Sequence, residues 1–262
     1  MPRKTNKYKY SFFTLLFINL IILVFAVYIV YNNRTAKHYL FSILSSFNTE
    51  KSLDPRNPPN GNYINGADVS EYQGVINWKK LKIDKKDFNF VFIRSTAGKN
   101  HRDRYFTYNW KQAKKNNIIR GAYHYYRPNE NSKLQAENFI KNVKLSSGDL
   151  PPVLDIENKS SVQSISSLKK GILSWLRIVE DHYGVRPIIY SSANYYQSFL
   201  AHDFGEYALW VANYNIVNSP IKRKKWLFWQ YSDKQRVLGV VGPVDLNVFN
   251  GSKEDLKTWF LR

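Results

Sequence analysis

The sequence predicts an α/β fold with eight strands, fewer helices and a mostly parallel sheet, preceded by one N-terminal transmembrane helix. Three observations lead to this prediction. Short runs of β-branched and aromatic residues alternate with helical patterns from Tyr63 onward, which is typical of βα architecture. Later connections such as Asn215–Lys225 are too short or too polar for a full helix, so a closed barrel would be irregular. An uncharged run near the N-terminus has the length of a bilayer span.

The N-terminus resembles a signal anchor. Residues 1–11 carry Arg3, Lys4, Lys7 and Lys9, and residues 12–31 form a twenty-residue run without a charge. The basic flank is expected in the cytoplasm, which places the rest of the chain outside. A cleavable signal peptide is the alternative, but its apolar region is usually shorter and ends in small residues. The run ends in Tyr28, Ile29, Val30 and Tyr31, which favours an uncleaved anchor.

Residues 32–62 are expected to form a linker. The stretch LDPRNPPNGN, Leu53–Asn62, is rich in proline and asparagine, which oppose regular structure. Tyr39–Phe47 is either a helix on the membrane surface or part of the stalk. The remaining residues, 63–262, are expected to form one catalytic domain.

Eight apolar runs in this domain predict strands: Tyr63–Val69, Phe90–Thr96, Gly121–Tyr126, Pro152–Glu157, Pro187–Ser191, Ala208–Tyr214, Trp226–Tyr231 and Val244–Phe249. The clearest helix is expected at Ser164–Tyr183, where apolar residues recur every three to four positions and Gly184 follows as a stop. Further helices are expected at Tyr105–Asn117 and Ser132–Val143.

The composition restricts the chemistry. The chain has no cysteine, which excludes disulfides, thiolate nucleophiles and cysteine-ligated metals. Its 39 basic and 20 acidic residues give a net charge of +19, of which residues 51–262 carry +14. Such a charge favours polyanions, whether nucleic acid, anionic lipid or an acidic cell wall.

The candidate catalytic residues are carboxylates at predicted strand ends. Asp155 and Glu157 alternate along LPPVLDIEN, so both side chains are expected on one face. Two carboxyls this close hold their protons unequally, so one can act as an acid while the other is ionised. A solvated or capping pair is the alternative for an isolated D-x-E. Asp68 and Asp245 occur on two other strands, and strand ends of a parallel βα fold converge on one reactive face.

Aromatic and polar residues near the same strand ends are candidate substrate-binding residues, although single aromatics more often belong to the core. They are Tyr123, His124, Tyr125, Tyr190, Trp210, Asn213, Tyr214, Gln230 and Tyr231. His124 has no histidine partner at metal-binding spacing, so a structural role is its alternative. No nucleotide-binding or G-x-S-x-G motif occurs, and we expect neither a metal nor a cofactor.

The order of motifs resembles glycoside hydrolase family 25, the Chalaropsis-type lysozymes. The matching segments span nearly all of residues 63–262: GADVSEYQGVINW, FVFIRSTAG, GAYHYYRP, LPPVLDIE, PIIYSS, LWVANY, WLFWQYS and VDLNVFNG. The resemblance implies an irregular TIM-like β/α barrel and an N-acetylmuramidase site containing Asp68, Asp155, Glu157 and Asp245, with Glu157 as general acid. The chain departs from the family's usual K-A-T-E-G run, because Arg94 replaces lysine and Ala97 replaces glutamate. We expect altered substrate contacts there.

The resemblance implies a muramidase that acts on peptidoglycan; with the predicted N-terminal anchor, we expect a membrane-anchored enzyme that acts outside the cytoplasm, and we expect a monomer. Asp155 would either orient the substrate's acetamido group as an internal nucleophile or activate a water molecule. One rival is an anchored glycan-binding module with an impaired site. Another is a nucleic-acid-binding domain, but such domains seldom line a cleft with four carboxylates.

Overall fold

The computed structural model describes residues 61–262 apart from 62, 84–85 and 223–224. The predicted span at residues 12–31 and the predicted linker therefore lie outside the described residues, except for the linker's Gly61. No helix in the described part of the chain is long and apolar enough to cross a membrane.

Eight strands close into a barrel, and each of them matches a predicted strand. They are β1 (Tyr63–Val69), β4 (Phe90–Ala97), β6 (Ile119–Tyr125), β7 (Val153–Asp155), β8 (Ile188–Ser192), β9 (Leu209–Ala212), β10 (Phe228–Gln235) and β11 (Val244–Asn250). The ring closes because β1 pairs with β4 on one side and with β11 on the other. The short strand β5 (His101–Arg102) extends the sheet beside the end of β4, and β2 (Lys82–Ile83) pairs only with β3 (Lys86–Asp87).

One barrel strand runs against the others. β11 is antiparallel to both β10 and β1, whereas the remaining barrel pairings are parallel. A loop of residues 236–243 joins β10 to β11 in place of a helical crossover, and Gly239 in this loop has a φ of 91°. A Cβ at Gly239 would lie 2.5 Å from the carbonyl oxygen of Asn77, so only glycine fits there.

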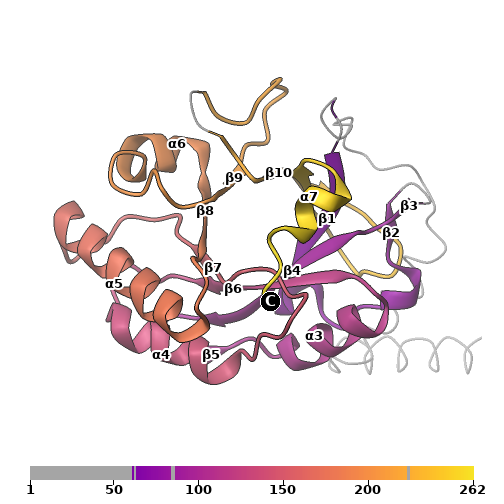
Figure 1. Ribbon diagram of the computed structural model, residues 1–262, viewed down its shortest axis with the longest axis horizontal. Coiled ribbons are helices and arrows are strands. Elements are labelled where there is room, and N and C mark those ends of the chain that lie inside the picture. Colours follow the sequence, from indigo (N-terminus) through magenta and orange to yellow (C-terminus); the bar gives the residue numbers. More distant parts are fainter. Residues whose placement is uncertain (1–60, 62, 84–85, 223–224) are drawn as a thin grey trace, which may run out of the picture. The chain divides into compact units, whose positions relative to one another are not determined.

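The helices cover only part of the barrel. The long ones are α3 (Phe106–Lys115), α4 (Ser132–Asn142) and α5 (Ile165–Tyr183), and they lie along one side in Figure 1. Between β8 and β9 there is only the short α6 (Ala193–Tyr195) and a π-helical turn, Tyr196–Leu200. The structure thus confirms the three predicted helices and the expected irregularity of the barrel.

The predicted ends of α5 are confirmed in detail. The Ser164 side chain accepts a hydrogen bond from the Ser167 N–H at the start of the helix, and Gly184 ends it with left-handed φ and ψ of 67° and 18°. Short helices complete the domain: α7 (Lys253–Lys257) and two 3₁₀ turns, η1 (Glu71–Gln73) and η2 (Trp78–Lys80).

Alternation along the strands produces two cores. Phe90 and Phe92 of β4 point into the barrel, where they pack with Trp210, Phe228 and other inner residues. Val91 and Ile93 belong to the outer core shared with the helices. The barrel interior is thereby filled with aromatic side chains, which leaves its carboxyl-terminal mouth as the place for a polar site.

Candidate active site

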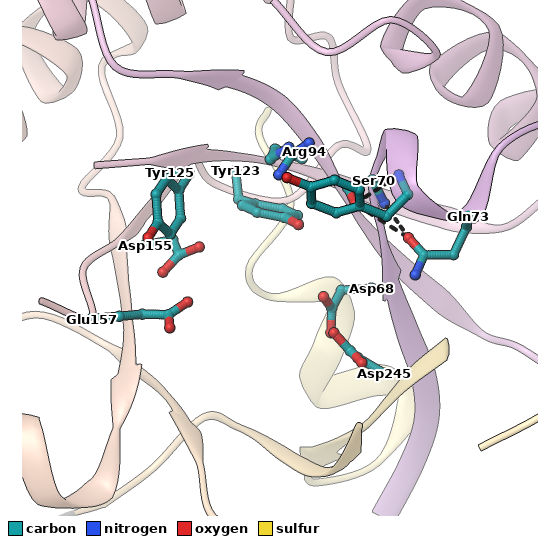
Figure 2. Close-up of a pocket in the computed structure, with 10 residues that line it drawn as sticks. Asp68, Ser70, Gln73, Arg94, Tyr123, Tyr125, Asp155, Glu157 and Asp245 are labelled. Atoms are coloured by element: carbon teal, nitrogen blue, oxygen red, sulfur yellow. Dashed lines mark hydrogen bonds between the residues drawn. The ribbon is translucent and has the colours of Figure 1, made fainter. Parts of the chain in front are cut away.

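The pocket lies at the mouth where the parallel strands end. It has a volume of about 220 Å³. Its lining contains all four predicted carboxylates together with polar and aromatic side chains: Asp68, Ser70, Tyr72, Gln73, Arg94, Tyr123, Tyr125, Asp155, Glu157 and Asp245. Figure 2 shows Asp155 and Glu157 on one side of the pocket, Asp68 and Asp245 on the other, and Tyr123 between them.

Asp68 and Asp245 form a pair across neighbouring strands. Asp68 lies near the end of β1 and Asp245 near the start of β11, directly opposite in the antiparallel register. We expected parallel strand ends to gather the carboxylates, but Asp245 reaches the mouth because its strand runs in the opposite direction. The prediction that the two residues meet was confirmed, and this part of its reasoning was wrong.

Burial and hydrogen bonding set the protonation of this pair. Asp68 Oδ2 accepts hydrogen bonds from Gln230 Nε2 at 2.7 Å and from Asn247 Nδ2 at 2.8 Å. Burial outweighs these bonds and raises the pKa of Asp68 to about 7. Burial and then the charge of Asp68 raise the pKa of Asp245 to about 9. At neutral pH, Asp245 therefore keeps a proton, which it donates to Asp68.

Asp155 and Glu157 form the second pair. β7 ends at Asp155, so Glu157 lies just beyond the strand that was predicted to include it. Asp155 is 4% exposed, whereas Glu157 is exposed to the pocket. Burial, followed by the negative charge of Glu157, raises the pKa of Asp155 well above its usual range, and the positive charge of Arg94 opposes that rise.

One oxygen of the second pair lacks a partner within the described part of the protein. Oδ1 of Asp155 is buried and has no hydrogen-bond partner among the described protein groups. A buried oxygen without a partner favours the protonated form of Asp155, in the same direction as the nearby charge of Glu157.

Two of the predicted substrate-binding tyrosines line the pocket. Tyr123 and Tyr125 alternate along β6, so both point to the mouth, and the phenol oxygen of Tyr125 accepts a hydrogen bond from Asn158 Nδ2 at 3.3 Å. Burial and then the charge of Asp68 raise the pKa of Tyr123, so its hydroxyl remains a hydrogen-bond donor.

Four other predicted residues form a hydrogen-bond network that holds Asp68 in place. The hydroxyls of Tyr190 and Tyr214 both donate to Gln230 Oε1, at 2.8 and 2.5 Å. Because its oxygen is occupied, Gln230 turns its amide nitrogen toward Asp68. Trp210 Nε1 donates to Asn247 Oδ1 at 2.7 Å and orients that amide toward Asp68 in the same way. These residues position Asp68 and do not line the pocket.

Three more predicted residues neither line the pocket nor hold Asp68 through their side chains. His124 is completely buried on the outer side of β6, where its ring nitrogens contact Thr96 Oγ1 and Gln135 Oε1 and its ring stacks on Trp175. Tyr231 packs in the outer core, and Asn213 holds its own loop through Pro220 and Asn215. The alternative structural role of His124 is therefore the better description, because alternation directs it away from Tyr123 and Tyr125.

The sequence did not predict Ser70, Tyr72, Gln73 or Asn247 as site residues. Asn247 follows Asp245 by two positions, so strand alternation could have placed it on the same face. Ser70 and Gln73 form a capping box around η1, a spacing that the sequence displays.

Arg94 and Ala97, the two departures from the family pattern, have different surroundings. Arg94 lines the pocket, with Nε donating to Asp103 Oδ2 at 3.1 Å and Nη2 to Glu71 Oε1 at 3.0 Å. Ala97 is buried at the end of β4 opposite Tyr125 and does not line the pocket.

Comparisons with known proteins agree with this geometry. Residues 67–240 match the model of the family described as glycosyl hydrolases family 25. The chain is 41% identical to YegX of Escherichia coli K12 over 199 residues, covering 75% of this chain and 73% of YegX. It is 36% identical to Lysozyme M1 of Streptomyces globisporus over 209 residues, covering 74% and 70%. A bacterial lysozyme structure from Streptomyces coelicolor superposes with a TM-score of 0.67 and 33% identity, covering 76% of this chain and 98% of that one.

Proposed function

Because the chain belongs to glycosyl hydrolases family 25 and is thus a glycoside hydrolase, we propose a specific reaction for it. The protein is a lysozyme that hydrolyses the β-1,4 bond between N-acetylmuramic acid and N-acetylglucosamine in peptidoglycan. The observation that carries this proposal is the mouth pocket, which is lined by four carboxylates in two pairs, and burial raises the pKa of Asp68, Asp155 and Asp245 there. Similarity to lysozymes of two Streptomyces species supports it.

Glu157 is the proposed general acid. It is the exposed member of the pair, so a glycosidic oxygen can reach it, whereas Asp155 is 4% exposed. In the free protein, burial favours the protonated form of Asp155. A bound sugar removes water from Glu157 as well, which favours transfer of that proton toward the carboxyl that faces the leaving oxygen.

Asp155 assists the reaction from its buried position beside Glu157. Besides burial, the charge of Glu157 and a side-chain hydrogen bond with it both raise the pKa of Asp155, so the two carboxyls lie close together. In inverting glycosidases the two carboxyls are about 6.5 to 9.5 Å apart, with room for a water molecule between them. This contact favours the substrate's acetamido group as internal nucleophile, with Asp155 orienting it. The product would then retain the anomeric configuration, which proton NMR of the fresh product can read.

Asp68 and Asp245 bind the sugar and shape the electrostatic potential on the side of the pocket opposite Asp155 and Glu157. Asp245 donates its proton to Asp68, and Asp68 is fixed by Gln230 and Asn247. A sugar hydroxyl or amide that enters the pocket meets preoriented acceptors there, at little cost in reorganisation.

The location of the enzyme is also proposed. The charge-free run at residues 12–31 and its basic flank support a single-pass anchor with the catalytic domain on the extracytoplasmic side. The net charge of +14 on residues 51–262 supports attraction to an anionic wall. All four carboxylates come from one chain, which supports a monomer as the active unit.

The test is incubation of the full-length protein, in non-ionic detergent, with purified peptidoglycan. Borohydride reduction of the products, followed by mass spectrometry, identifies the sugar at each new reducing end. Muramic acid at those ends supports the proposal. Binding to the glycan without release of reducing ends would instead indicate the glycan-binding module, and glucosamine ends would indicate a different bond specificity.

A further inference from the structure

Tyr72 is a large aromatic side chain that the fold keeps in solvent at the edge of the pocket. Its exposed fraction is 77%, yet it contributes to the pocket lining. The other aromatic among the exposed hydrophobic residues of the described chain is Tyr108, at 40%. Aromatic rings of this size are usually buried, so a ring held outside at a substrate pocket needs a reason beyond packing.

The backbone that carries Tyr72 is firmly held. The residue lies in η1, where the Ser70 side chain and the Gln73 side chain cap the turn reciprocally. Gln73 Nε2 also donates to the carbonyl oxygen of Pro243 at 3.1 Å, and the N–H of Glu71 donates to Asp103 Oδ2 at 2.8 Å. The turn is therefore tied to the β10–β11 loop on one side and to the segment after β5 on the other.

One face of the Tyr72 ring is occupied by Arg94. The Arg94 Cζ atom lies 4.7 Å from the ring centroid. The guanidinium is fixed by Asp103 and Glu71, and the Arg94 side chain is 10% exposed. Such a cation–π contact orients the ring, because two carboxylates hold the cation in place. The second face of the ring remains in solvent.

We infer that the uncovered face of Tyr72 is a sugar-binding platform, positioned by Arg94, for the residue next to the sugar at the carboxylates. The chemical class it fits is a pyranose with equatorial substituents, as in β-1,4-linked glucosamine and muramic acid derivatives. Such a ring presents a face of axial C–H groups, which packs on the face of an aromatic ring. This inference deepens the proposed function by assigning one sugar contact, and it rests on that function for the identity of the glycan.

The platform predicts a change in affinity and a smaller change in turnover. Tyr72 lies outside both carboxyl pairs, so its ring contacts the sugar equally in the ground state and in the transition state. Tyr72→Ala is expected to raise KM about tenfold, the loss expected for a single aromatic stacking contact, with most of the fall in kcat/KM residing in KM. Tyr72→Phe keeps the ring and is expected to restore most of the affinity.

The test uses the full-length protein in non-ionic detergent and two readouts. The first is steady-state hydrolysis of soluble peptidoglycan strands by the wild type, Tyr72→Ala, Tyr72→Phe and the control Tyr108→Ala. The second is calorimetric binding of a chitin oligosaccharide, which does not depend on hydrolysis. Weakened binding and raised KM in Tyr72→Ala, with the Tyr108→Ala control close to wild type, support the platform. If the wild type binds the oligosaccharide but cleaves nothing, the proposed function fails while the binding comparison still tests the platform.

The Arg94→Lys variant distinguishes positioning of the Tyr72 ring by Arg94 from a general loss of protein stability. Lysine keeps the charge but loses the planar fork that joins Asp103 and Glu71. As a single substitution, Arg94→Lys is expected to raise KM. Added to Tyr72→Ala, it is expected to raise KM little further, because both substitutions remove the same contact. Unchanged KM and binding in Tyr72→Ala would overturn the inference, as would fully additive effects of the two substitutions on KM.

Discussion

Replacing Asp245 by asparagine should make the folded domain more resistant to rising pH. In the folded protein, burial and Asp68 raise the pKa of Asp245 to about 9 from a reference value of 3.8. The folded chain therefore retains a proton that the unfolded chain has lost over most of that interval. Such a group does not change the free energy of unfolding below about pH 4. Above that pH it lowers the free energy of unfolding, by an amount that grows until the pH reaches the pKa of Asp245 in the folded protein.

The magnitude follows from the number of protons retained. One extra proton in the folded state lowers the free energy of unfolding by about 1.4 kcal/mol for each pH unit. Asp68, with a pKa of about 7, is hydrogen-bonded to Asp245, so we count one proton for the pair and not two. Between pH 6 and pH 8 the wild type should therefore lose about 3 kcal/mol from this pair. Asparagine keeps an N–H donor toward Asp68 and has no proton to lose.

The assay is denaturant unfolding of the full-length protein followed by near-ultraviolet circular dichroism at several values between pH 4 and pH 8. Asp245→Asn and the wild type should have similar stability at the acidic end, and the variant should become the more stable one as the pH rises. Other titrating groups, including the buried His124 with its pKa lowered to about 4 by burial, occur in both proteins and cancel in the difference. Asp181→Asn, at an exposed position on α5, is the matched control. A difference that stays constant with pH, or one that favours the wild type at pH 8, would refute this reasoning.

Three further predictions concern the anchor, the charge and the support of Asp68. A reporter fused after Arg262 should be active only outside the cytoplasm, and the full-length protein should stay in the membrane fraction after alkaline washing; a soluble, shortened product would instead show cleavage near Tyr31. Binding to purified walls should weaken as salt rises, since exposed charges are screened beyond about 10 Å at 0.1 M salt; salt-independent binding would leave the net charge without this role. Asn247→Leu should lower the free energy of unfolding by about 1 to 3 kcal/mol in thermal or denaturant unfolding, because Trp210 Nε1 loses its buried acceptor; unchanged stability would contradict that bond.

Much of the fold was predictable because the barrel strands are short, apolar and separated by helical or turn signals. All eight predicted strands and three predicted helices were confirmed, with shifted ends. The sequence could not show that β11 runs antiparallel, because the apolar pattern VDLNVFN is the same in either direction. Chain direction depends on the return between β10 and β11, which includes the tight contact of Gly239 with Asn77.

The site was predictable where alternation alone decides the position of a side chain. Tyr123 and Tyr125 share the pocket face, and the same rule places His124 in the outer core, but only the structure shows which face is the interior. Around Arg94, the register of β4 with β6 shifts before Thr96, so simple alternation fails there. The role of Tyr72 depends on contacts with residues more than twenty positions away, which no local pattern contains.

The measurement that tests the central claim most directly is the rate at which Glu157→Gln releases muramic acid reducing ends from peptidoglycan. Glutamine keeps the size of Glu157 but cannot donate the proton to the leaving oxygen, so turnover should fall about 10²- to 10⁴-fold while binding persists. Asp155→Asn should also reduce turnover strongly, and the double variant should lose less than the product of the two single effects, because the two residues act as one unit in the reaction. Release by Glu157→Gln at nearly the wild-type rate would contradict the account and would move the acid to Asp155 or Asp68.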